Sequence, residues 1–305
     1  MLRALGLGDF LTAVPALRAL SDAFPGHRRV LAAPAALEPL ARLSATVDEL
    51  VDTAPLAPIE ASLQGAEVAV NLHGRGPQSL HLLRATHPRR LIAFDDGDGG
   101  PRWRPGEHEV RRWCRLLEES GIPADPTRLE LPPPPSAGLG RVTVIHPGAA
   151  SAARRWPPQR WAAVARHEVR QGRTVVVTGG PDERRLAVEV AEGAGLPNRA
   201  VLAGRTDLLG LAGVVAGARV VLCGDTGVAH LATAFGTPSA VLFGPVPPSE
   251  WGPPTDRPQH VAIWAGRRGD PHATEPDPGL LEISVGDVVA AVAQARPITS
   301  TMRST

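Results

Sequence analysis

Three segments of this sequence end an apolar run with glycine and a charged residue, a pattern suited to binding an anion. The first is GLGD at 6–9, the second is HPGA at 146–149 with an arginine pair after it, and the third is GDTG at 224–227. In each segment, small residues leave backbone N–H groups accessible and a helical pattern follows. A helix start offers unpaired N–H groups and about half a positive charge, so each segment predicts a phosphate-binding loop.

Asp9 closes the first segment and has two interpretations. As a helix N-cap, its carboxylate would only accept backbone hydrogen bonds. As a catalytic group, it would lie at the carboxyl edge of a parallel sheet, where open α/β folds bind ligands, and would accept a proton. An ordinary aspartate has a pKa of about 3.9, so Asp9 is expected to be ionised at neutral pH.

The second segment carries arginines that suit a diphosphate. Arg154 and Arg155 precede a helix expected to begin at Pro157 or Pro158, and Gly148 keeps the preceding loop open. An arginine fork matches the geometry of phosphate oxygens. The alternative is a solvated arginine pair in a surface loop.

The third segment carries donors at a helix start. Thr226 and Gly227 would present N–H groups to a phosphate, and His230 lies one turn further on the same face. Asp225 only accepts hydrogen bonds when ionised, so it would orient the loop or bind sugar hydroxyls rather than a diphosphate. A helix cap at Asp225 and a buried structural histidine at His230 are the alternatives.

Two further strand ends carry candidate residues. In TGGPDE (178–183), a nucleotide could lie against the backbone, with Asp182 or Glu183 on the ribose hydroxyls, although an ordinary turn has the same pattern. His73 and Arg75 follow another apolar run and could face an acceptor substrate.

Parallel strands must position these residues. Short apolar runs alternate with amphipathic stretches, which predicts an α/β fold with parallel sheets covered on both faces. The expected strands are 2–5, 30–33, 68–72, 91–94, 142–146, 174–178, 201–202, 220–223 and 240–243. The expected helices are 10–23, 37–43, 78–85, 107–120, 159–170, 183–194, 208–216, 228–234 and 285–295. Residues 245–280 are rich in Pro and Gly and are predicted to form a long loop.

Length and composition fix the general class. A chain of 305 residues suits about two domains. The proline run 132–135 and the following SAGLG predict a linker, with domains at 1–137 and 138–305 and a last helix able to pack back on the first domain. The net charge of +1 argues against a polybasic nucleic-acid or membrane binder. The longest apolar stretch, 208–218, is shorter than the roughly 20 residues that cross a bilayer, so a cytoplasmic protein is expected.

Several common motifs are missing from the sequence. GLGDFL has Leu11 where the dinucleotide motif needs its third glycine, and no P-loop or nucleophile elbow occurs. His108–Glu109 and His167–Glu168 lack the second histidine of a zinc hydrolase. DDGD (95–98) is similar to a metal-binding acidic pair but is also typical of a turn. We therefore expect neither a metal nor a cofactor.

The set of motifs resembles glycosyltransferase family 9, the family of the bacterial ADP-heptose:lipopolysaccharide heptosyltransferases. The resemblance is carried by GLGD (6–9), HPGA followed by RRWPPQRW (146–161), VVVTGGPDE (175–183) and GDTGVAHLATAFGTPSAVLFGP (224–245). It implies a GT-B fold, in which two Rossmann-like domains face each other across a cleft. The N-terminal domain would bind the acceptor and the C-terminal domain the nucleotide-sugar.

The resemblance also implies a reaction: inverting, metal-independent transfer of a sugar from a nucleotide-diphosphate donor, ADP-heptose or a relative, to a hydroxyl of a glycolipid, glycan or natural product. Asp9 becomes the general base, and Arg154 occupies the position of a lysine that usually holds the donor phosphates. His73 and Arg75 would bind the acceptor. The implied donor-binding residues are Gly8, Gly148, Arg154, Thr178, Gly179, Glu183, Asp225, Thr226, Gly227 and His230.

Two other functions fit the same scaffold: a nucleotide-sugar epimerase or hydrolase, and a protein that binds the sugar nucleotide without turning it over. The expected partners are the donor and the acceptor, with no nucleic acid, and membrane association only through the acceptor. The sequence leaves open the acceptor, the nucleobase and sugar of the donor, the oligomeric state, and which of Arg154 and Arg155 holds the diphosphate.

Overall fold

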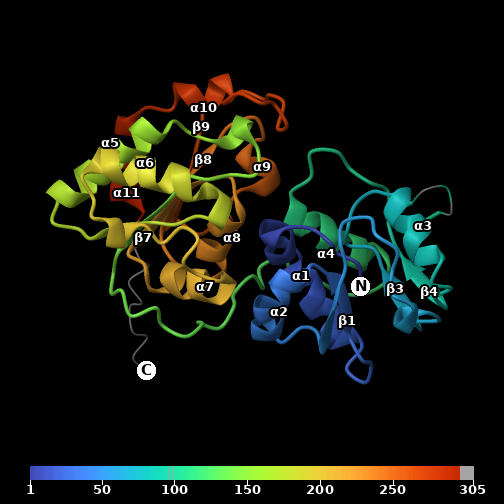
Figure 1. Ribbon diagram of the computed structural model, residues 1–305. Coiled ribbons are helices and arrows are strands. Elements are labelled where there is room, and N and C mark those ends of the chain that lie inside the picture. Colours follow the sequence, from blue (N-terminus) through green and yellow to red (C-terminus); the bar gives the residue numbers. More distant parts are fainter. Residues whose placement is uncertain (96, 98, 296–305) are drawn as a thin grey trace, which may run out of the picture. The chain divides into compact units, whose positions relative to one another are not determined.

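The chain divides into two compact units, Met1–Pro132 and Pro133–Thr305, each built on parallel strands (Figure 1). The computed structural model describes residues 1–95, 97 and 99–295. The division falls within the proline run at 132–135. In the described part of the chain, the helices are all too short or too polar to span a membrane.

Unit 1 joins two pairs of parallel strands through the N-terminal segment. Its elements are α1 (Leu7–Ala23), β1 (Val30–Ala33), α2 (Glu38–Ser44), β2 (Glu49–Asp52), β3 (Val68–Val70), α3 (Gln78–Arg84), β4 (Arg90–Ile92) and α4 (Glu109–Glu119). β1 pairs with β2, and β3 pairs with β4. Leu2 forms parallel bridges to Ala32 on one side and to Asn71 on the other, which gives the order β2–β1–Leu2–β3–β4. The strand predicted at 2–5 is reduced to this bridge because α1 begins at Leu7, earlier than predicted.

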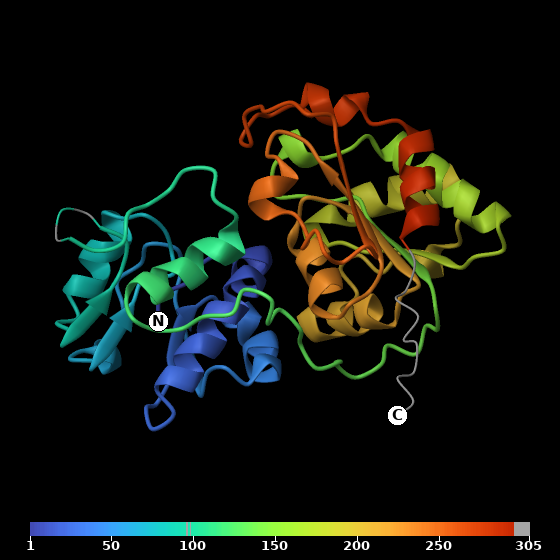
Figure 2. The ribbon, with the colours of Figure 1, turned by 180° about the vertical axis from the view of Figure 1, so that it is seen from behind.

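Unit 2 contains one five-stranded parallel sheet in the order β6–β5–β7–β8–β9. The elements are β5 (Thr143–His146), α5 (Pro158–Arg170), β6 (Val175–Val177), α6 (Arg184–Ala194), α7 (Leu208–Gly217), β7 (Val220–Gly224), α8 (Gly227–Ala234), β8 (Ser239–Phe243), α9 (Pro248–Trp251), β9 (His260–Trp264), α10 (Pro278–Glu282) and α11 (Val285–Gln294). Helices α5, α6 and α11 pack together on one side of the sheet, and α7 and α8 pack together on the other (Figures 1 and 2). Covering both faces explains why the strands are apolar throughout.

Two sequence predictions in unit 2 are corrected by the structure. Residues 245–280 are not one loop, since they contain β9 and two short helices. The strand predicted at 201–202 is a single bridge between Val177 and Val201. The apolar face of α11 packs on α5, β8 and β9 within unit 2.

His260, at the start of β9, makes the stability of unit 2 sensitive to acid. The residue is buried, its Nδ1 lies 2.9 Å from the Ser239 hydroxyl, and its buried Nε2 has no hydrogen-bond partner among the described residues. Burial, helped by the positive charge of Arg257, lowers the pKa of His260 from 6.5 to about 4. The unfolded chain therefore binds a proton between these two pH values and the folded chain does not.

We predict that the free energy of unfolding falls as the pH drops from 6.5 towards 4, by up to about 3 kcal/mol from this residue. Urea unfolding at pH 7 and pH 5 measures the loss. His260→Gln should reduce it, whereas His272→Gln, at an exposed histidine of the same unit, should leave it unchanged. Equal losses in the wild type and His260→Gln would show that His260 does not cause the effect.

Candidate active site

The chain reverses its direction across the sheet of unit 2 between β5 and β7. β5 pairs with β6 on one side and with β7 on the other, and the chain visits β6 before it returns to β7. Loops that leave the carboxyl ends of two such strands diverge to opposite sides of the sheet, and the crevice between them is where open α/β folds bind ligands. The predicted loops after β5, β6 and β7 all begin at this edge.

The Glu183 side chain lies against glycines of the two loops that follow β5 and β6. A Cβ atom placed on Gly148 would lie 2.0 Å from a carboxylate oxygen of Glu183, so only glycine lets the carboxylate lie this close. A Cβ on Gly179 would lie 3.1 Å from Glu183 Cβ. The Glu183 carboxylate also accepts a 2.8 Å hydrogen bond from Gly180 N–H at the start of the short helix Pro181–Glu183. The structure thus brings together the candidates Gly148, Gly179 and Glu183.

His146, the last residue of β5, supports this cluster. It is buried, with Nδ1 3.1 Å from the hydroxyl of Thr178 and Nε2 3.8 Å from Glu183 Oε2. Burial lowers its pKa, although the charge of Glu183 acts in the opposite direction. A neutral ring is therefore expected at pH 7. Sequence reasoning assigned no role to His146, although a histidine that ends an otherwise apolar strand is a usable signal.

Arg154 and the loop after β7 form the second cluster. Arg154 Nη1 donates to the carbonyl oxygen of Asp225 at 3.3 Å and lies 3.7 Å from Asp225 Oδ2. A Cβ on Gly224 would lie 3.0 Å from the Arg154 carbonyl oxygen, so the absence of a side chain at Gly224 allows this approach. Within the described residues, Arg154 Nε and Thr226 Oγ1 are buried without hydrogen-bond partners. Two polar groups are therefore available to a ligand here.

Arg154 and Arg155 make different contacts. Arg155 Nε donates to the carbonyl oxygen of Ala149 at 2.9 Å and so stabilises its own loop.

The loop that carries Arg154 is also bound by residues far away in the sequence. Ala153 N donates to the Ala273 carbonyl at 3.2 Å, and the Ala153 carbonyl accepts from Asp277 N at 3.1 Å. Part of the stretch predicted as a long loop thus fixes the residue next to Arg154.

The position at which α8 begins tests the helix-cap interpretation of Asp225. Thr226, in an extended conformation, is the N-cap of this helix, and Asp225 lies outside it. The helix-cap interpretation of Asp225 is therefore wrong. Gly227 begins the helix, and His230 follows one turn later with its half-buried ring 6.0 Å from that of Trp251.

In unit 1, Asp9 lies in the first turn of α1, whose N-cap is Gly6, so Asp9 is not the N-cap residue, although its carboxylate accepts hydrogen bonds from the backbone of Gly6 and of Asp9 itself. Gly8 precedes it in the same turn. Asp9 Oδ1 lies 3.3 Å from Arg3 Nη2, and 29% of the Asp9 side chain is exposed. Burial raises the pKa of Asp9; Arg3 opposes this increase and Glu109 adds to it. A raised pKa makes an ionised carboxylate a stronger base.

The loop after β3 brings His73 towards the same arginine. Asn71 shapes this loop: its amide donates to the Gly74 carbonyl at 3.2 Å, and its oxygen accepts from His73 N at 3.1 Å. His73 Nδ1 is buried and lacks a hydrogen-bond partner within the described residues. Burial and the charge of Arg3 lower the pKa of His73. Arg75 is exposed on the same loop.

Arg3 and Glu109 are the residues that sequence reasoning missed. Arg3 lay inside a strand predicted from its apolar neighbours, and Glu109 was considered only as half of a zinc motif. A charged residue within an apolar run is the signal that could have identified Arg3.

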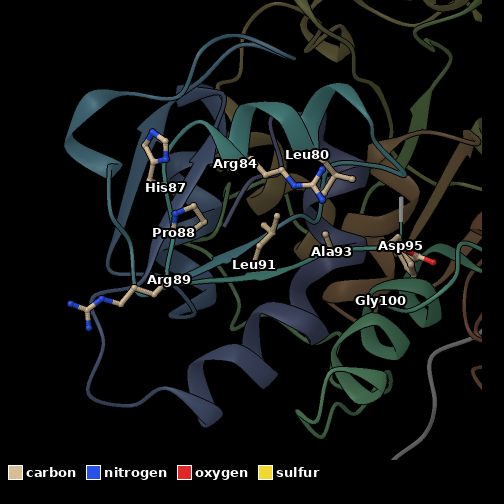
Figure 3. Close-up of a pocket in the computed structure, with 10 residues that line it drawn as sticks. Leu80, Arg84, His87, Pro88, Arg89, Leu91, Ala93, Asp95 and Gly100 are labelled. Carbon is tan, nitrogen blue, oxygen red and sulfur yellow. The ribbon is translucent and has the colours of Figure 1, made fainter. Parts of the chain in front are cut away.

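A surface hollow of about 560 Å³ lies beside β4 and is lined in part by Arg84, His87, Arg89 and Asp95 (Figure 3). Figure 3 shows the Arg89 side chain extending away from the other labelled side chains. The predicted site residues do not line this hollow, so it is separate from the candidate site.

The acidic stretch 95–98 forms a turn where it is described. Asp95 Oδ1 accepts from Gly97 N at 2.7 Å and from Gly99 N at 3.0 Å. Asp96 and Asp98 lie outside the described residues. Across the described part of the chain, no three His, Cys, Asp or Glu side chains are grouped so that they could hold a metal ion.

Comparison with known proteins gives a consistent family. Residues 102–276, more than half of the chain, match glycosyltransferase family 9 (heptosyltransferase). Lipopolysaccharide heptosyltransferase 3 of Escherichia coli is 32% identical over 172 residues, which is 54% of this chain and 50% of that protein. The chain thus spans about half the length of this curated relative.

Solved structures agree over nearly the whole chain. A family 9 glycosyltransferase from Veillonella parvula has a TM-score of 0.76 at 18% identity, covering 96% of this chain and 95% of that one. Escherichia coli heptosyltransferase WaaC with ADP has a TM-score of 0.72 at 19% identity, covering 96% and 98%. This likeness confirms the predicted GT-B fold class.

Gly148→Ala tests the cluster around Glu183. The added methyl group would displace the Glu183 carboxylate, which is the end of a flexible side chain, so we predict a loss of stability below about 1 kcal/mol. The sequence predicts ribose hydroxyls as the ligand of this carboxylate, so we expect affinity for a nucleotide, measured with ADP, to fall roughly tenfold. Isothermal titration calorimetry and thermal unfolding measure the two effects.

The matched control is Gly217→Ala at the end of α7, where a Cβ would meet open space. It should leave both values unchanged. Unchanged ADP affinity in Gly148→Ala would contradict the predicted contact between Glu183 and a nucleotide.

Proposed function

Because the chain belongs to glycosyltransferase family 9, we propose that it transfers heptose from ADP-heptose to an acceptor hydroxyl, with inversion at the sugar carbon and without a metal ion. The observation that carries the proposal is the pair of buried atoms without partners, Arg154 Nε and Thr226 Oγ1, next to the start of α8 in the described structure. A buried polar group without a partner costs about 1–3 kcal/mol. Phosphate oxygens at this position would satisfy both groups.

In this proposal, unit 2 binds the donor. Arg154 and the first N–H groups of α8 hold the diphosphate, and the Asp225 carboxylate, 3.7 Å from Arg154 Nη1, orients the guanidinium. The Glu183 carboxylate accepts from ribose hydroxyls and lies over glycine backbone, which leaves room for the nucleotide. The neutral His146 ring, with Nδ1 3.1 Å from the Thr178 hydroxyl, lies 3.8 Å from the Glu183 carboxylate through Nε2 and helps to position it. The ADP in the similar structure of WaaC supports this choice of nucleotide.

Unit 1 supplies the base. Asp9 accepts the proton of the acceptor hydroxyl while that oxygen attacks the sugar carbon. The bond from this carbon to the diphosphate oxygen breaks, and its electron pair leaves with ADP. Attack on the face opposite the leaving group inverts the carbon. Arg154 and the α8 N–H groups stabilise the charge that gathers on ADP, a role in which one donor is worth roughly 3–4 kcal/mol.

His73 and Arg75 are proposed to contact the acceptor. The unpartnered Nδ1 of His73 suits a sugar hydroxyl, and Arg75 suits an anionic group. The curated relative is named for lipopolysaccharide, so we propose a glycolipid or glycan acceptor of that kind. Association with a membrane would then come through the acceptor.

Asp9→Asn is the central test. The amide cannot take a proton, so we predict that transfer falls by at least about 10²-fold. Affinity for ADP should stay at the wild-type value, because the proposed donor contacts lie in unit 2. Transfer from ADP-heptose is followed by mass spectrometry of the acceptor, and binding is followed by calorimetry.

Asp22→Asn is the matched control, because Asp22 lies at the exposed end of the same helix. It should transfer sugar at the wild-type rate. ADP release from the donor without acceptor would instead indicate a hydrolase. Wild-type transfer by Asp9→Asn would exclude Asp9 as the base.

Arg154→Met tests the diphosphate site. The loss of a charged donor should weaken ADP binding by about 2 kcal/mol, or roughly 30-fold. Arg155→Met should have a smaller effect, because the contact that it removes lies within its own loop. Thermal shifts with ADP, UDP, GDP and CDP measure both the loss and the nucleobase preference. A larger loss in Arg155→Met would reverse the two assignments.

A further inference from the structure

Arg3 binds Asp9 at two points. Its side chain is 1% exposed and lies directly after the bridge at Leu2. Nε donates to the backbone carbonyl of Asp9 at 2.8 Å, and Nη2 lies 3.3 Å from Asp9 Oδ1. Nη1 donates to the carbonyl of Leu72, the residue before His73. One guanidinium thus connects the first turn of α1 to the loop after β3.

Glu109 holds Arg3 from the opposite side. This residue, at the start of α4, accepts from Arg3 Nη2 at 3.0 Å and from Trp113 Nε1 at 2.8 Å through the same oxygen. Its second oxygen accepts from Arg112 Nε at 3.0 Å. The Arg3 guanidinium also lies 4.7 Å from the centre of the Trp113 ring. The side chain of Arg3 is therefore fixed by contacts other than those to Asp9.

The cluster is balanced in charge: Arg3 and Arg112 are positive, and Asp9 and Glu109 are negative. Buried ion pairs are a poor source of stability, and apolar side chains of similar size often serve as well. The stability of unit 1 alone therefore does not require this arrangement. Asp9 is the member of the cluster with the most exposed side chain, and a ligand could reach it there.

We propose that Arg3 is a positioning residue that fixes the Asp9 carboxylate for proton transfer, and that Glu109 offsets the positive field of Arg3 at Asp9. The proposal deepens the function proposed above and rests on Asp9 as the base. The other charged groups around the pair are Arg112, on the far oxygen of Glu109, and His73, which lies in the field of Arg3.

The roles proposed for Arg3 and Glu109 predict that substituting each residue shifts the pKa of Asp9 in opposite directions. Arg3→Met removes the positive charge and leaves burial and Glu109 to act on Asp9, so the pKa of Asp9 should rise. Glu109→Gln keeps the size of the side chain but removes its charge, so Glu109 no longer offsets the positive charge of Arg3 and the pKa of Asp9 should fall. A merely structural role would not give shifts of opposite sign.

The direct readout is the carboxyl carbon-13 resonance of Asp9 in the full-length protein, assigned by its absence in Asp9→Asn and followed with pH. We expect shifts of about one unit or more, upwards in Arg3→Met and downwards in Glu109→Gln. The acid limb of the pH profile of kcat/KM should move in the same directions. No shift in either variant, or shifts of the same sign, would overturn the proposal.

Positioning is tested separately by Arg3→Lys, which keeps the charge but loses the planar fork that reaches several acceptors. We expect kcat to fall about 10²-fold with KM nearly unchanged. In an Asp9→Asn background, Arg3→Lys should cost little more. An equal loss in both backgrounds would mean that Arg3 does not act through Asp9.

Separate controls test for misfolding and for failure of the base assignment. If Arg3→Met does not fold, Glu109→Gln and Arg3→Lys still test both roles. The exposed pair Arg42 and Glu38 on α2 gives the matched controls Arg42→Met and Glu38→Gln, which should leave the resonance and the pH profile unchanged. If Asp9→Asn retains transfer, the assignment of Asp9 as the base fails, whereas the resonance shifts still report whether Arg3 and Glu109 control Asp9.

Discussion

Parallel strands end at one edge of their sheet, and the candidate donor site depends on this constraint. β5, β6 and β7 are hydrogen-bonded neighbours, so residues that follow them are brought within a few ångströms although they are 30–80 positions apart in sequence. Gly148 and Gly224 then allow Glu183 and the Arg154 backbone to approach more closely than a Cβ would permit. The sheet brings the loops close together, and the absence of side chains at the two glycines leaves space for these contacts.

Arg3 and Arg154 differ in what their donor groups bind. In Arg3, all three guanidinium nitrogens donate within the protein, and the side chain is almost fully enclosed. In Arg154, the side chain is 28% exposed and the buried Nε has no partner within the described residues. An arginine with satisfied donors can only organise protein groups around it. One with a spare donor and partial exposure can bind an incoming anion, which is why we assign the two residues different roles.

Local pattern predicted most of the fold. Strand β1 has the predicted bounds, and β5 to β8 differ from prediction by one residue at either end, because runs such as TVIH and VVV are apolar on both faces. β9 was not predicted because its five residues lie within a Pro- and Gly-rich stretch. β2 was not predicted because ELVD is short and partly acidic. Apart from Gly8, which lies in α1, the donor candidates could be predicted together because each follows a strand of one sheet.

The contacts that set the chemistry of Asp9 could not be predicted in the same way. Glu109 lies 106 positions from Arg3, and nothing in the sequence near either residue indicates the other. The same holds for Asp277, which fixes the loop of Arg154 from more than 120 positions away. Periodicity and turn signals act within about one helix or strand, whereas the field at a carboxylate depends on every charge packed around it. Sequence motifs therefore identify candidate reacting groups, and only the tertiary structure identifies the charged residues packed around them.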